Sequence, residues 1–119
     1  MASNASVALL LEDEPLISID VEETLEEAGF AVTTVMSCRD ADDWLNMCRP
    51  DVAIVDIELK DGPCTRVVER LIAADVPFIV HSGEHLSTYV GTPFARGLWL
   101  SKPAEPGELA DAARALIAA

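Results

Sequence analysis

The chain has 119 residues, 50% of them hydrophobic, and this size is typical of one domain with a single core. Its 21 acidic and 8 basic residues give a net charge of −13, which would repel nucleic acid, so we expect no nucleic-acid binding. The longest aliphatic run, Val7 to Leu11, is far shorter than the ~20 residues that a bilayer span requires, and no basic residue precedes it as in a secretory signal. We therefore expect a cytoplasmic domain over residues 7–119, without membrane association, after a disordered stretch at residues 1–6.

Strands and helices alternate in the first part of the predicted structure. Val7 to Leu11 is continuously apolar and stops at acidic residues, as a strand buried on both faces does. Pro15 suits the first position of a helix, whose apolar residues recur at helical spacing until Gly29. The segment Phe30 to Val35 is rich in β-branched residues and predicts a second strand, and Ser37 then caps a second helix. The apolar stripe expected for that helix is Ala41, Trp44, Leu45 and Cys48, before a proline that ends it.

The same unit repeats in the rest of the chain. Val52 to Val55 predicts a third strand that ends on Asp56, and the turn Lys60 to Pro63 leads into a third helix. Short strands follow at Phe78 to Val80 and Leu98 to Leu100, and Pro106 begins the last helix. The remaining segment has Gly91 and Pro93 within a sparse apolar pattern, which predicts a short or irregular fourth helix over residues 84–96. Alternating strands and helices of this kind predict an α/β fold with a doubly wound, five-stranded parallel sheet.

Reactive side chains follow the predicted strands, and ligands of such folds bind beyond the carboxyl ends of the strands. Glu12 and Asp13 follow the first strand, Asp56 the third, Ser82 the fourth and Lys102 the fifth. Crowded carboxylates repel one another unless a cation neutralises them, and an oxygen-only ligand set favours Mg²⁺, or Mn²⁺, over zinc. Acidic residues at a helix N-terminus are also favourable by themselves, but that does not explain why Asp56 and Lys102 share the same end of the sheet.

With these residues in this order, the sequence resembles a response-regulator receiver domain of two-component signalling. The blocks "ALLLEDEPLI", "VAIVDIELKDG", "HSG" and "LWLSKP" match that family in order, from about Val7 to the end of the chain. The resemblance implies a flavodoxin-like (CheY-like) fold in which Asp56 is the phosphoacceptor for a histidine kinase or histidine phosphotransfer protein. It also implies a cis peptide bond between Lys102 and Pro103.

The resemblance assigns further roles to the residues at this edge of the sheet. Asp13, Asp56 and the backbone carbonyl of Glu58 would hold Mg²⁺, with Glu12 acting through water. Ser82 and Lys102 would contact the phosphoryl oxygens, and Lys102 would offset the charge that develops when an anionic carboxylate attacks phosphorus. Movement of Ser82 towards the phosphoryl group would then change the surface that partners read.

Two departures from the family pattern concern the output. Receivers commonly carry tyrosine or phenylalanine three residues before the lysine as a switch side chain, whereas this chain has Trp99, which would act either as a switch or as a fixed packing residue. The segments "VPFIVHSGEH" and "PFARGLWLSKP" resemble in part the PFxFATGUY subgroup of single-domain receivers, known from alphaproteobacterial signalling. Here His81 and His85 stand among the replaced letters, and we expect structural or solvent-facing roles for both.

The sequence is compatible with three functions. The leading one is a stand-alone receiver in a phosphorelay, which is no enzyme beyond its own phosphorylation and dephosphorylation, and which signals to an unknown downstream protein, with phosphorylation-dependent dimerisation as an option. The alternatives are a phosphorylation-independent binding module and a small Mg²⁺-dependent phosphohydrolase. Cys38, Cys48 and Cys64 are odd in number and lack metal-ligand spacing, so we expect reduced, buried thiols.

Overall fold

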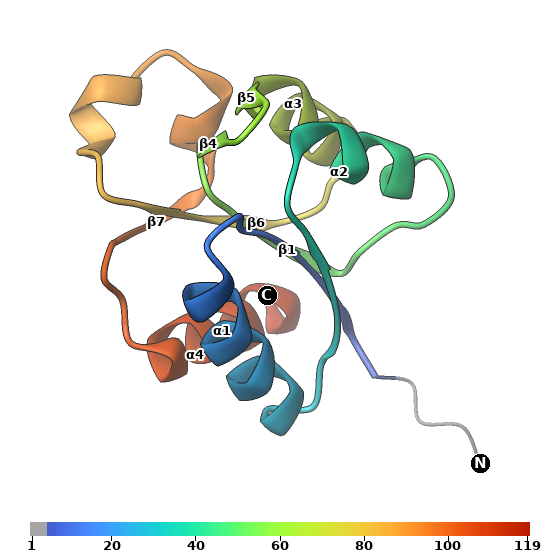
Figure 1. The fold of residues 1–119 in the computed structure, drawn as a ribbon. Coiled ribbons are helices and arrows are strands. Elements are labelled where there is room, and N and C mark those ends of the chain that lie inside the picture. The colour runs from blue at the N-terminus through green and yellow to red at the C-terminus, as the bar shows by residue number, and fades with distance from the viewer. Residues whose placement is uncertain (1–4) are drawn as a thin grey trace.

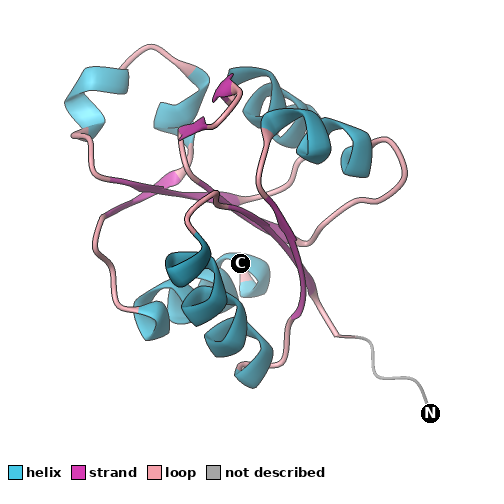
Figure 2. Ribbon diagram, in the orientation of Figure 1, coloured by secondary structure: helices cyan, strands magenta, loops and turns pink. Residues whose placement is uncertain are grey.

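The computed structural model describes residues 5–119. These residues form a five-stranded parallel sheet with helices on both faces (Figures 1 and 2). Its strand order is β2-β1-β3-β6-β7, so the direction of winding reverses between β1 and β3. The two long helices α1 and α4 pack together on one face, and α2 and α3 lie on the other (Figure 1). The predicted doubly wound α/β fold is confirmed. The strands of the sheet are β1 (Val7–Leu11), β2 (Ala31–Val35), β3 (Val52–Val55), β6 (Phe78–Ser82) and β7 (Leu98–Ser101).

The helices also follow the predicted order. Pro15 begins α1, and Gly29, with a φ of +100°, lets the chain turn back after that helix as expected. In place of a regular helix between β6 and β7, residues 86–89 and 93–96 form two short 3₁₀ helices, so the expectation of a short or irregular fourth helix is confirmed. The helices are α1 (Pro15–Glu27), α2 (Cys38–Leu45), α3 (Thr65–Ala73), α4 (Pro106–Ala118), η1 (Leu86–Tyr89) and η2 (Pro93–Arg96).

The sheet separates two apolar cores. Alternate residues of β1 point to opposite faces, so Leu9 and Leu11 pack under α2 and α3 while Ala8 and Leu10 pack under α1 and α4. Burial on both faces explains why the strands read as unbroken apolar runs in the sequence.

The start of the chain is described from residue 5 onward. Disorder is predicted for residues 1–6, and residues 1–4 of these lie outside the described part of the chain. Within the described part, the Ser6 carbonyl accepts a hydrogen bond of 2.9 Å from the Ala31 N–H. None of the helices within residues 5–119 is long and apolar enough to cross a bilayer.

The prediction of three reduced, buried thiols is wrong, although Cys64 is buried as expected. Cys38 and Cys64 form a disulfide, because the start of α2 and the start of α3 bring their Cα atoms to 5.4 Å. Cys48 is free and exposed, and it lies beyond α2, which ends at Leu45. The sequence signal for the pairing is absent, since the two residues are 26 positions apart and meet only when both helices pack on one face.

A small hairpin replaces the simple turn expected after β3. Its strands are β4 (Glu58–Leu59) and β5 (Gly62–Pro63), which pair in antiparallel fashion around Lys60 and Asp61. Gly62 has a φ of +115°, a conformation that side-chain-bearing residues rarely adopt. The hairpin therefore gives the segment after Asp56 a defined shape.

Candidate functional site

Three carboxylates meet where β1 and β3 end. These strands are parallel neighbours, and Leu11 lies beside Val55, so the residues that follow both strands emerge at the same edge. The Asp56 N–H donates a hydrogen bond of 3.2 Å to the Leu11 carbonyl, which continues this pairing by one residue. As a result, carboxylate oxygens of Glu12, Asp13 and Asp56 lie within 4.8 Å of one another.

Lys102 supplies the positive charge of this cluster. Its Nζ lies 2.8 Å from Asp56 Oδ2 and 3.2 Å from Glu12 Oε1. The residue follows β7, and its N–H donates a hydrogen bond of 2.8 Å to the Ser82 carbonyl, which fixes its backbone beside the end of β6. The peptide bond from Lys102 to Pro103 is cis, as expected.

The burial of these groups changes their protonation equilibria. Burial raises the pKa of Glu12, against the opposing effects of the Glu14 N–H bonded to its carboxylate and of the Lys102 charge. Burial alone would lower the pKa of Lys102, but the hydrogen bond and charge of Asp56, together with Glu12, outweigh it and the pKa is raised. Lys102 is therefore charged at neutral pH and attracts both carboxylates.

The carboxylate cluster fits a hard divalent cation. All three side chains offer oxygen ligands, and one lysine leaves part of their combined negative charge uncompensated. Mg²⁺ is bound through one or two carboxylates and retains several waters, so such a cluster suits it without further side chains. The donor chemistry therefore agrees with the ligand type that the sequence indicates.

An open pocket of about 450 Å³ lies directly over Asp56. Ser82 is buried at the end of β6, and its Oγ accepts a hydrogen bond of 2.9 Å from the Glu84 N–H. Because a hydroxyl can accept and donate at once, Ser82 still has its proton for a ligand in the pocket. The pocket is lined by Asp56, Ile57, Glu58, Ser82, Gly83, Glu84, Tyr89 and Lys102.

Aromatic side chains form the wall beside this pocket. The Trp99 Nε1–H donates a hydrogen bond of 3.1 Å to the Glu84 carbonyl, and its ring lies 5.7 Å from that of Tyr89. Tyr89 also meets Phe94 edge to face at 5.8 Å. Sequence reasoning missed Tyr89 as a pocket residue, since it belongs to an irregular segment whose position follows only from the fold.

The two histidines differ in environment. His81 is buried on β6, where burial and then the Lys102 charge lower its pKa, and its Nε2 accepts a long hydrogen bond of 3.4 Å from the Ala104 N–H. His85 is exposed just before η1. The first therefore has a structural contact and the second faces solvent.

Comparison with known proteins identifies the family. The model of the response regulator receiver domain matches residues 8–114. The chain belongs to this family. The virulence transcriptional regulatory protein PhoP of Salmonella typhimurium is 34% identical over 68 residues, which are 57% of this chain and 30% of that protein. This receiver domain thus spans less than a third of the length of the curated relatives that it matches.

Solved receiver domains share the fold. The receiver domain of a LuxO repressor protein from Vibrio parahaemolyticus superposes with a TM-score of 0.83 at 19% identity, covering 96% of this chain and 91% of that one. The receiver domain of sensor histidine kinase PA1611 from Pseudomonas aeruginosa gives a TM-score of 0.81 at 24% identity, covering 97% and 99%, and is described with magnesium coordinated in its active site cleft.

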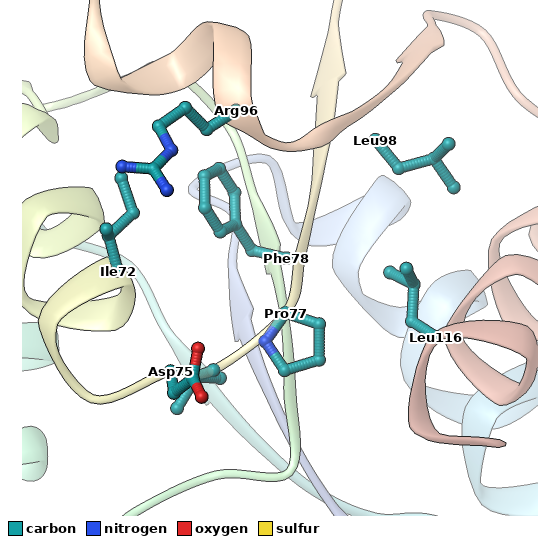
Figure 3. Close-up of a pocket in the computed structure, with 8 residues that line it drawn as sticks. Ile72, Asp75, Pro77, Phe78, Arg96, Leu98 and Leu116 are labelled. Atoms are coloured by element: carbon teal, nitrogen blue, oxygen red, sulfur yellow. The ribbon is translucent and has the colours of Figure 1, made fainter. Parts of the chain in front are cut away.

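A second hollow, of about 200 Å³, lies at the opposite end of the sheet. Figure 3 shows it between the end of α3, the start of β6 and the C-terminal part of α4. Its polar side chains are Asp75 and Arg96, beside apolar residues such as Phe78. This hollow has neither the clustered carboxylates nor the lysine of the site around Asp56.

Proposed function

We propose that the domain accepts a phosphoryl group on Asp56 from a phosphohistidine of a sensor histidine kinase or histidine phosphotransfer protein. The observation that carries this proposal is the position of Asp56, which lies under an open pocket, within reach of Lys102 and beside two further carboxylates. In the reaction an Asp56 carboxylate oxygen forms a bond to phosphorus while the bond from phosphorus to the imidazole nitrogen of the donor breaks.

The side chains around Asp56 divide the work of this transfer. Bound through Asp13, Asp56 and the Glu58 carbonyl, with Glu12 acting through water, Mg²⁺ would supply charge neutralisation for the phosphoryl oxygens, and Mn²⁺ would serve similarly. Lys102 keeps the Asp56 carboxylate oriented before transfer and can contact a phosphoryl oxygen afterwards. The Ser82 hydroxyl can donate a hydrogen bond to another phosphoryl oxygen.

Output would pass through protein contacts on the surface near β6 and β7. Movement of Ser82 towards the phosphoryl group would release the Glu84 N–H, and Glu84 is also the residue whose carbonyl holds Trp99. The contacts of Trp99 with Glu84 and Tyr89 support a fixed packing role for the indole. We propose a cytoplasmic phosphorelay component with a downstream protein partner and no affinity for nucleic acid, in which phosphorylation can promote dimerisation.

The test is intact mass after incubation with Mg²⁺ and acetyl phosphate, beside Asp56→Asn and a sample with chelated metal. One added phosphoryl group that both controls lose supports the proposal. If beryllofluoride also fails to bind the folded, Mg²⁺-loaded protein, the domain is a phosphorylation-independent binding module instead. Sustained hydrolysis of phosphoester substrates would identify a phosphohydrolase.

A further inference from the structure

The disulfide joins two elements on the same side of the sheet. Cys38 is the first residue of α2, and Cys64 is the residue that immediately precedes α3. Cys64 also ends the segment that begins at Asp56 and includes the β4–β5 hairpin. The disulfide therefore connects α2 covalently to the loop that carries the proposed phosphoacceptor.

A backbone hydrogen bond links Cys64 to the residue next to Asp56. Its N–H donates a bond of 2.9 Å to the carbonyl of Ile57, the residue after Asp56. This bond closes the hairpin, and the hairpin contains Glu58, whose carbonyl we place among the Mg²⁺ ligands. A shift of Cys64 would therefore also displace the backbone at Asp56 and Glu58.

The same place also accommodates the reduced form. Cys38 Sγ lies 3.3 Å from the Gly62 carbonyl oxygen, so a thiol at this position would have an acceptor for its proton. The Asp61 carboxylate accepts hydrogen bonds of 2.8 Å and 3.0 Å from the Cys38 and Arg39 N–H groups. Reduction would therefore remove the covalent link and leave weaker contacts that preserve the fold.

The two sulfurs differ in accessibility. Cys38 is partly exposed, whereas Cys64 is fully buried in the core cluster beneath α2 and α3. A solution oxidant or reductant would therefore react first at Cys38, and Cys64 would act as the resolving thiol from within. Cys48 is exposed and lies outside the pair, so it provides an internal reference.

We propose that Cys38 and Cys64 form a reversible, peroxide-sensitive disulfide that restrains the phosphoacceptor loop. In the oxidising direction the Cys38 thiolate attacks a peroxide oxygen, which gives a sulfenic acid and one water once the leaving hydroxide is protonated. The Cys64 thiol then attacks the Cys38 sulfur and a second water leaves, so two thiols and one hydrogen peroxide yield the disulfide and two waters. A dithiol reductant reverses the step by thiol–disulfide exchange.

The disulfide is tested by thiol counting and hydrogen exchange on the complete chain. Alkylation in denaturant, which also exposes the buried Cys64, followed by intact mass should show three modified cysteines in dithiothreitol-reduced protein. After treatment with hydrogen peroxide and removal of the oxidant, one cysteine, Cys48, should be modified, and Cys48→Ser should show none. Amide exchange of residues 57–64 should be about threefold or more slower in the oxidised form. The matched control Cys48→Ser should show the same difference between its two redox states, and Cys38→Ser should show none.

The effect on phosphorylation rests on the proposed function and is measured separately. Acetyl phosphate should phosphorylate the oxidised protein about two- to fivefold faster, because a restrained loop holds Asp56 and the Glu58 carbonyl in place. Three alkylated cysteines at every peroxide concentration would overturn the disulfide, and equal exchange in both forms would overturn the restraint. If neither form is phosphorylated or binds beryllofluoride while thiol count and exchange behave as stated, the proposed function fails and the redox pair stands.

Discussion

Lys102 competes with a metal ion for the same carboxylates. Its ammonium group contacts both Asp56 and Glu12, so it must share or give up these contacts when a divalent cation arrives. We expect Lys102→Met to bind Mg²⁺ about three- to tenfold more tightly, because one repelling charge is removed, and to accept phosphate more slowly because the transition-state charge is less well offset. Calorimetric titration with Mg²⁺ and the rate of mass increase with acetyl phosphate measure the two effects.

Lys60 provides the matched control, since it is the other lysine of the chain and lies exposed at the tip of the β4–β5 hairpin. Lys60→Met removes the same charge from the whole molecule without touching the cluster, so its Mg²⁺ affinity should stay close to that of the wild type. Equal changes in both variants would show that net charge, not the contact with Asp56, sets the affinity.

The side chain of Glu58 should influence how long the aspartyl phosphate lasts. Glu58 and Glu84 line the pocket over Asp56, and a carboxylate there can accept a hydrogen bond from an attacking water. We expect Glu58→Asn to lengthen the half-life about two- to tenfold, because the amide is a poorer acceptor and no base. The decay of the phosphorylated mass after donor removal measures this, and an unchanged rate would exclude a role for the Glu58 side chain.

At the scale of elements, the junction between η2 and β7 depends on a glycine. A Cβ at Gly97 would lie 2.5 Å from a ring carbon of Phe78, which is buried at the start of β6 (Figure 3). We expect Gly97→Ala to lower the free energy of unfolding by about 1–3 kcal/mol through overpacking. Gly107 in the first turn of α4 has open space around it, so Gly107→Ala should be neutral or stabilise by up to about 1 kcal/mol. Urea unfolding of both variants compares them, and equal losses would contradict the steric explanation.

The elements with strong local patterns are those that the sequence predicts well. Val7–Leu11 and Val52–Val55 are strands with the predicted bounds, because buried parallel strands need unbroken apolar runs. The β4–β5 hairpin and the Cys38–Cys64 disulfide escape prediction, since both depend on how the segments pack against one another. The carboxylate cluster could be anticipated because all its members follow strands, whereas Tyr89 could not because it reaches the pocket from an irregular segment.

At the scale of the whole molecule, the buried Glu12 should give stability a distinctive pH dependence. Its pKa is raised above the ordinary value of 4.5, so the folded protein binds this proton more tightly than the unfolded chain does. The contribution of Glu12 to the stability of metal-free protein therefore grows as pH falls through the raised pKa and levels off below 4.5. Glu12→Gln retains an acceptor for the Glu14 N–H and should remove this contribution, which melting temperatures of both proteins across that range would reveal.

Mg²⁺ should stabilise the molecule in two separable ways. A chain with a net charge of −13 repels itself, so any salt raises its melting temperature by screening, whereas a bound cation adds a specific effect. At a concentration of 100 times its dissociation constant, a ligand that binds only the native state adds about 2.7 kcal/mol. MgCl₂ should therefore stabilise the wild type more than NaCl of equal ionic strength, and Asp13→Asn should lose most of that excess while keeping the response to NaCl. An equal excess in the variant would place the bound cation away from the cluster of Glu12, Asp13 and Asp56.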